Sequence, residues 1–213
     1  MTPSANERAA YWIDVVSTVL LALATVATAW AGYQSSRWHG EQAEAQARAT
    51  AARVESARFS GVANRQDQID VALFIQWVDA HTLGETRLAE FYRRRFRDEF
   101  RPAFQAWLAT KPLTNPDAPL TPFAMPDYQL AATREVDRLE AKAAVAAEVA
   151  REDIERADRY VLAVVLFASS LFFAGISTRL RTQWGEAAIL GLGCVLFIGT
   201  VIWIATFPVS VAV

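Results

Sequence analysis

Three blocks of apolar residues constrain this chain more than any other feature of its sequence. They cover residues 11–33, 160–178 and 187–207. Each is close to the roughly 20 residues that an α-helix needs to cross the hydrocarbon core of a bilayer. The first block is followed by Trp30-Ala-Gly-Tyr33, which is a poor cleavage site, so we expect a retained span and not a signal peptide. The sequence predicts an all-α integral membrane protein with three transmembrane helices and the lipid bilayer as a partner.

The polar segment between the first two blocks predicts two long helices that pair with one another. Small or apolar residues recur there at spacings of four and three, which places them on one face of a helix. The outgoing seam is Ser36, Gly40, Ala43, Ala47, Thr50, Val54, Ala57, Gly61 and Asn64, and the returning seam is Ala132, Val136, Leu139, Ala143, Ala146, Ala150, Asp153, Ala157 and Tyr160. We expect an antiparallel, coiled-coil-like stalk outside the bilayer. The abundance of alanine leaves open the alternative that this register is incidental.

A helical head is expected at the end of the stalk. It would begin with a short helix over residues 67–80, and Thr82 with Glu85 fits a capping box that starts the next helix. That second helix carries a row of aromatic residues, and Pro102 should kink or divide it near Arg101. The aromatic row is Tyr92, Phe96, Phe100, Phe104 and Trp107, which we interpret as the core of the head.

The end of the head is rich in proline. Five prolines lie within residues 111–126, and this density favours an extended, stiff loop over a helix. Asp127 follows the last of them and is expected to cap the returning helix. The predicted organisation is an N-terminal transmembrane helix (1–35), an outgoing stalk helix (36–64), a helical head with a Pro-rich loop (65–126), a returning stalk helix (127–159) and a transmembrane hairpin (160–213).

The charge of the short loops predicts the orientation. Arg179 and Arg181 lie in the loop between the last two spans, and positively charged short loops stay on the cytoplasmic side. This places the N-terminus in the cytoplasm and the head in the periplasm, with the protein in the inner membrane of a bacterial cell. Arginines that flank the membrane ends on the stalk side favour the opposite orientation. These are Arg37, Arg48, Arg151, Arg156 and Arg159.

Composition and motifs exclude several classes of function. The formal net charge is −2, so the chain has no basic excess for a nucleic-acid partner. The one cysteine, Cys194, lies within the third apolar block, so no intrachain disulfide can form. No phosphate-binding glycine loop, nucleophile elbow or zinc signature is present. We therefore expect no enzymatic activity, no cofactor and no metal site.

One face of the first span is polar and gives the first functional hypothesis. Asp14, Thr18, Thr25, Gly32 and Ser36 follow one another at helical spacing, with alanine between them. Lipid gives no reason to keep a carboxylate and hydroxyls on one face, so this face is expected to meet protein or water. In a homo-oligomer it would line an ion-conducting pore. The alternative is that the small residues pack against the other spans while Asp14 reaches the headgroups.

A cluster of arginines in the head gives the second hypothesis. Arg93, Arg94, Arg97 and Arg101 lie beside Tyr92 and would bind a lipid headgroup or an acidic protein partner. The protein would then be a membrane-anchored scaffold or adaptor whose head docks that partner. The alternative is an ordinary solvated face, because acidic residues lie within reach of these arginines.

The layout resembles an uncharacterised family of small three-span bacterial inner-membrane proteins. The resemblance depends on Trp30-x-x-Tyr33-Gln34 at the end of the first span, on the charged, alanine-rich helical segment and on the closing hairpin with its basic loop. It implies a membrane location and three spans, and it implies no activity.

Overall fold

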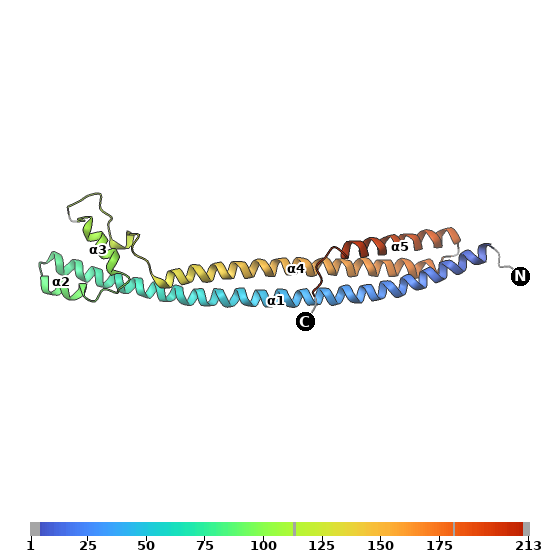
Figure 1. Ribbon diagram of the computed structural model, residues 1–213, viewed down its shortest axis with the longest axis horizontal. Coiled ribbons are helices and arrows are strands. Elements are labelled where there is room, and N and C mark those ends of the chain that lie inside the picture. Colours follow the sequence, from blue (N-terminus) through green and yellow to red (C-terminus); the bar gives the residue numbers. More distant parts are fainter. Residues whose placement is uncertain (1–4, 113, 181, 211–213) are drawn as a thin grey trace. The chain divides into compact units, whose positions relative to one another are not determined.

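The computed structural model describes residues 5–112, 114–180 and 182–210 (Figure 1), and every regular element in them is helical. Three helices are long and apolar enough to cross a membrane, as the three apolar blocks predicted. The elements are α1 (Ala5–Thr82), α2 (Thr86–Arg93), α3 (Arg101–Ala109), the 3-10 helix η1 (Pro122–Ala124), α4 (Ala131–Ser177) and α5 (Gln183–Ile204).

The chain forms two compact units whose boundaries differ from the predicted parts. The terminal unit contains Met1–Gln46 and Ala147–Val213, and the central unit contains Ala47–Ala146. Helix α1 is unbroken, so the predicted short helix over residues 67–80 is the last part of α1. Both capping predictions are wrong: Glu85 makes no side-chain capping bond to α2, and α4 begins at Ala131, four residues after Asp127.

In the terminal unit α1 and α4 run antiparallel. The hydroxyl of Ser17 donates a 3.0 Å hydrogen bond to the carbonyl of Ala174, and further along α1 the buried Ala31 packs in one cluster with Tyr160 and Phe167. Helix α5 joins them through Leu190, which is buried in a second cluster with Leu20 and Ala174. Small side chains at the contacts let the helices approach closely, as is usual in helix pairs that cross a membrane.

Gln34, the last residue of the Trp-x-x-Tyr-Gln motif, joins α1 to the segment after α5. Its side chain is buried, and its amide makes two hydrogen bonds with the backbone of Ser210. The Gln34 Nε2 group donates to the Ser210 carbonyl at 3.3 Å, and the Ser210 N–H donates to Gln34 Oε1 at 3.1 Å. Beside them the Tyr160 hydroxyl donates to the Pro208 carbonyl at 3.0 Å. These bonds satisfy backbone groups that no longer have helical partners.

The two predicted seams have opposite outcomes. On α4 the seam is confirmed: seven of its nine residues are buried and Val136 and Ala146 are half-buried. On α1 the predicted seam is wrong, because Ala43, Ala47 and Val54 are exposed. The buried face of α1 lies two residues away, which is about 200° around a helix with 3.6 residues per turn. Its residues are Ala45, Ala49, Ala52 and Ser56.

The central unit has an aromatic core built on α1. Phe74 and Trp77 of α1 are buried against the rings of the predicted aromatic row, which come from α3 and the turn before it. Pro102 lies in the first turn of α3, where its missing N–H costs nothing, and the predicted division of the helix is confirmed. The buried members of the row are Phe96, Phe100, Phe104 and Trp107.

We predict that the corrected face of α1 responds to an added side chain and the opposite face does not. Ala49→Leu places three extra carbons at a fully buried position and should lower the free energy of unfolding by about 1–3 kcal/mol. Ala47→Leu adds the same atoms at an exposed position and should change it by less than about 0.5 kcal/mol. Unfolding of the detergent-solubilised protein measures both. If Ala47→Leu lowers the free energy of unfolding more than Ala49→Leu does, the seam predicted from the sequence is the buried face after all.

Candidate functional site

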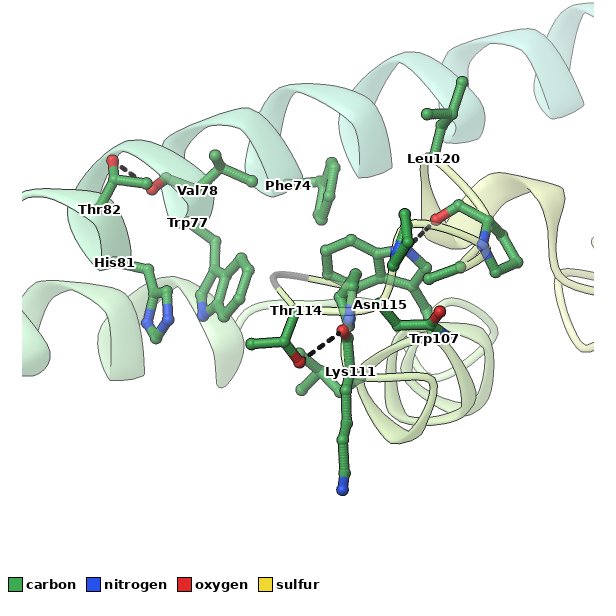
Figure 2. Close-up of a pocket in the computed structure, with 15 residues that line it drawn as sticks. Phe74, Trp77, Val78, His81, Thr82, Trp107, Lys111, Thr114, Asn115 and Leu120 are labelled. Atoms are coloured by element: carbon green, nitrogen blue, oxygen red, sulfur yellow. Dashed lines mark hydrogen bonds between the residues drawn. The ribbon is translucent and has the colours of Figure 1, made fainter.

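The central unit contains an open cavity of about 630 Å³ beside its aromatic core (Figure 2). One wall comes from the last turns of α1, with Phe74, Trp77 and His81. The opposite wall comes from the C-terminal end of α3 and the Pro-rich loop that follows it. Cavities of 300–1,000 Å³ with mostly apolar walls are typical of small-molecule sites. This cavity is therefore the candidate site.

Ring contacts fix the aromatic wall. The imidazole of His81 stacks on the indole of Trp77, with 4.9 Å between ring centroids and 13° between planes. Phe74 meets Trp107 edge-to-face, with the centroids 5.3 Å apart. Such offset and edge-to-face pairs add to the stabilisation from burial alone. The rings thus form a preorganised wall whose positions do not depend on a ligand.

Hydrogen bonds hold the Pro-rich loop against α3. The indole N–H of Trp107 donates to the Pro119 carbonyl at 2.7 Å. Within the loop the Asn115 side chain accepts a bond from the Asp117 N–H at 3.1 Å and donates to the Thr110 carbonyl at 3.2 Å. The loop is therefore ordered by its own polar groups, and Pro112, Pro116 and Pro119 line the cavity without a backbone N–H that needs a partner.

Two cavity residues are basic and none of the described ones is acidic. His81 lines the aromatic wall and Lys111 the rim. Lys111 has φ = 54°, and it lies two residues after α3, where glycine is the usual residue in this left-handed conformation. Its carbonyl accepts hydrogen bonds from the N–H groups of Thr114 and Asn115, at 3.0 and 2.9 Å. A non-glycine residue in this conformation costs roughly 1 kcal/mol. The strained position is therefore occupied by a residue that places a positive charge at the rim.

A buried polar network closes the unit on the other side of the aromatic core. Asp70 is fully buried, and Arg97 donates to its Oδ2 atom at 2.9 Å. Arg97 also pairs with Glu99, and Glu99 accepts the N–H of Ala131 at 2.9 Å, which caps α4. The Tyr128 hydroxyl lies 3.2 Å from Asp70 Oδ2, and 3.0 Å from an oxygen of Asp67, so the two carboxylates share its proton. We call Asp67, Asp70, Arg97, Glu99 and Tyr128 the Asp70 network.

The network shifts the protonation of its members. Burial raises the pKa of the Asp70 carboxyl, although Arg97 and the Tyr128 hydroxyl oppose the shift. Burial and the charge of Asp70 also raise the pKa of the Tyr128 hydroxyl. Two buried acceptors, Asp70 Oδ1 and Gln66 Oε1, have no hydrogen-bond partner, and they lie one helical turn apart on α1. A proton on Asp70 Oδ1 would turn this atom into a donor, and Gln66 Oε1 is an acceptor for it. A protonated Asp70 agrees with its raised pKa.

The arginines predicted to bind a partner are paired within the chain. Arg93 and Arg94 both bind Glu90, at 2.7 and 3.2 Å. Arg101 binds Asp98 at 2.8 Å and donates to the Phe96 carbonyl at 3.0 Å. The fourth arginine, Arg97, belongs to the Asp70 network. The hydroxyl of Tyr92, which lies beside the cluster, donates to Gln76 at 3.4 Å. The predicted cluster is thus largely occupied by its own neighbours.

The polar stripe of the first span lies on an unpacked face of α1. Asp14, Thr18, Thr25, Gly32 and Ser36 are all exposed, so they do not pack against α4 or α5 within the chain. The Thr18 and Thr25 hydroxyls donate to carbonyls one turn earlier on α1, at 2.8 and 2.7 Å. Each threonine oxygen keeps lone pairs that face outward. The alternative in which these residues pack against the other spans does not describe this chain.

No protein-family model, curated protein or solved structure matches the chain. The site must therefore be interpreted from its own geometry. The cavity could not be predicted from the sequence: Trp107 was expected in the core of the head and the prolines in a loop, but no local pattern indicates that the two enclose a space. The sequence shows only that a proline-dense loop follows a helix that carries Trp107.

We predict that two substitutions of Asp70 differ in their effect on the free energy of unfolding. Asp70→Leu removes one partner of Arg97 and should lower the free energy of unfolding by about 2–3 kcal/mol. This is less than the roughly 3–5 kcal/mol expected for an isolated buried pair, because Arg97 keeps Glu99 and is 22% exposed. Asp70→Asn keeps an acceptor for Arg97 and gains a donor for Gln66, so it should fold. Hydrogen exchange of residues 96–107 in the detergent-solubilised protein measures both.

The same pair of proteins tests the pH dependence. Since the folded pKa of Asp70 is raised, its contribution to stability is largest below the unfolded pKa, near the ordinary 3.8, and falls as pH rises through the folded pKa. Asp70→Asn should remove this fall, which begins as the pH rises above the ordinary pKa of 3.8. Identical pH profiles for wild type and Asp70→Asn would contradict the assignment.

Proposed function

We propose that this protein is a membrane-anchored binding protein whose central unit takes up a ligand outside the bilayer. The observation that carries the proposal is the cavity between Trp77 and Trp107, with its fixed aromatic wall and ordered loop. The proposal refines the adaptor hypothesis: the docking position moves from the paired arginines to the cavity.

The distribution of charge supports a position of the central unit outside the membrane. The apolar blocks lie in the terminal unit, whereas the central unit carries ion pairs along its helices, such as Arg58 with Glu55 and Arg138 with Glu135. Charged groups of this density are not tolerated in hydrocarbon. The basic loop between α4 and α5 supports an inner-membrane protein with a cytoplasmic N-terminus and a periplasmic central unit.

A neutral aromatic probe tests the proposal. The full-length protein in nanodiscs of zwitterionic lipid should bind 2-naphthamide with a dissociation constant of about 0.1–1 mM, as expected for a ligand of this size. Saturation-transfer NMR, corrected with empty nanodiscs, measures the binding. Thr82→Trp fills the cavity from the exposed end of α1 and should weaken binding at least about tenfold.

Ile75→Trp is the matched control for that experiment. Ile75 is 50% exposed on the same helix and does not line the cavity, so its substitution should leave the dissociation constant unchanged. The proposal fails if wild type shows no binding above empty nanodiscs, or if both tryptophan variants bind as wild type does.

A second candidate function is the oligomeric pore, and the exposure of the polar stripe favours it. A homo-oligomer that brings the stripes of several α1 helices together would satisfy Asp14 and direct threonine oxygens to a common axis. The same exposed face continues through the small residues Gly40, Ala43 and Ala47, which would let neighbouring copies approach closely.

We predict that a pore of this kind depends on Asp14 and Thr25. In planar bilayers, Asp14→Asn and Thr25→Leu should each reduce the cation conductance of the reconstituted protein several-fold, because they remove a charge and an oxygen from the stripe. Val26→Leu, at a 69% exposed position beside the stripe, is the control. Absence of currents, or currents that neither variant alters, would remove the pore from consideration.

A further inference from the structure

We propose that the ligand of the cavity is a small amphipathic anion: an apolar body that lies against the aromatic wall and a single carboxylate or similar group that pairs with Lys111. This inference depends on the proposed function, because it names the ligand class of the same cavity. Four observations carry it.

The first observation is the sign of the charge around the cavity. Lys111 and His81 are its ionisable groups among the described residues, and no carboxylate lines it. The arginines of the predicted cluster differ in this respect, since Arg93 and Arg94 have Glu90 beside them. A ligand with a positive charge would find no partner here, whereas an anion would find one.

The second observation is the freedom of the Lys111 ammonium group. No ion pair or hydrogen bond of this group is present among the described residues, and the side chain is exposed. Figure 2 shows the Lys111 side chain starting beside Thr114 and extending away from Trp77, so that its ammonium group ends in the open at the edge of the cavity. The anionic group is therefore placed at the rim, where solvent can reach it, and the apolar body lies inside.

The third observation is the residue type and backbone at this position. The chain has 21 lysines and arginines, of which only Lys111 and Lys142 are lysines. Lys111 also occupies a left-handed position where glycine would be less strained. The ammonium group of lysine is a compact charge on a flexible side chain, so it can fold over a bound ligand from a position at the rim.

The fourth observation is size. A cavity of about 630 Å³ holds a drug-sized molecule and is too small for a folded partner. The wall offers ring edges and methyl groups of Phe74, Val78 and Leu108 to an apolar body. A short peptide or a protein segment is the competing occupant, and the experiment must tell it from a small molecule.

A pair of isosteric probes tests the inference. 2-Naphthoate and 2-naphthamide share the same ring and differ in charge, so their ratio of dissociation constants isolates the anionic group. In nanodiscs of phosphatidylcholine at pH 7, naphthoate should bind about threefold to fivefold more tightly, the range of a solvent-exposed ion pair. The preference should decline in 0.5 M salt, because the pair is at the rim.

Three variants assign the preference to Lys111. Lys111→Gln should bring the ratio of the two dissociation constants to about one, and Lys111→Arg should restore most of the preference. Lys142→Gln removes the same charge from an exposed position of α4 in the same unit and should leave the ratio unchanged. The naphthamide constant should stay the same in all three, which shows that the cavity is intact.

The outcomes separate the two proposals. Equal binding of both probes, with no effect of Lys111→Gln, would overturn the anionic ligand class and leave the binding function standing. If neither probe binds above empty nanodiscs, both the anionic ligand class and the proposed binding function are overturned. An equal loss of preference in Lys142→Gln would mean a general effect of charge and would also overturn the inference.

Discussion

The hydrogen bond from Arg97 to the buried Asp70 is the interaction on which the register of the central unit depends. Helix α1 passes through this unit without a break, so it offers a single helical surface for the connecting segment to fold against. The guanidinium of Arg97 bonds two carboxylates at once, one on α1 and one on Glu99, and Glu99 in turn caps α4. The planar fork of arginine allows this double contact, which a lysine could not make with the same geometry. Without it, burial of apolar surface would still favour packing of the aromatic residues on α1, but no polar contact would fix their register.

The sequence was informative where neighbouring residues differ in size and polarity. Three spans follow from composition alone, and the α4 seam follows because Leu139 and Tyr160 alternate with charged residues, so one face is plainly apolar. On α1 both Ala45 and Ala47 belong to rows of small residues on opposite faces of the helix. Because alanine occurs on both faces, size and polarity do not distinguish the buried face from the exposed one. Which face is buried depends on contacts that only the folded chain brings together. The error on α1 is therefore a consequence of its composition.

Local motifs failed for a related reason. The Thr82–Glu85 capping box and the Asp127 cap are both correct in residue type, but neither makes the expected bond. The N-terminus of α4 is capped by Glu99, which lies 32 residues away in the chain from Ala131. A helix start can be stabilised by any carboxylate that tertiary structure delivers to it. The cavity was unpredictable for the same reason, since its walls come from α1, α3 and the loop that Trp107 binds through the carbonyl of Pro119.

The arginines of the cluster and Lys111 differ in whether an acidic side chain of the same unit pairs with them. An arginine paired with a carboxylate at about 3 Å is a dipole, and its field falls off faster with distance than that of a single charge. Arg101 pairs one to one with Asp98, and Arg93 and Arg94 share Glu90, so most of the charge of these arginines is compensated within the chain. Lys111 is a single charge on an exposed side chain beside an apolar space, so its field reaches a ligand within the screening length of about 8–10 Å. The arginine cluster has the higher density of basic residues, but its charges already have acidic neighbours, whereas Lys111 lies beside an apolar space that a ligand can enter. A charge without an internal partner gains one when a ligand arrives, and this is why the rim of the cavity bears on binding.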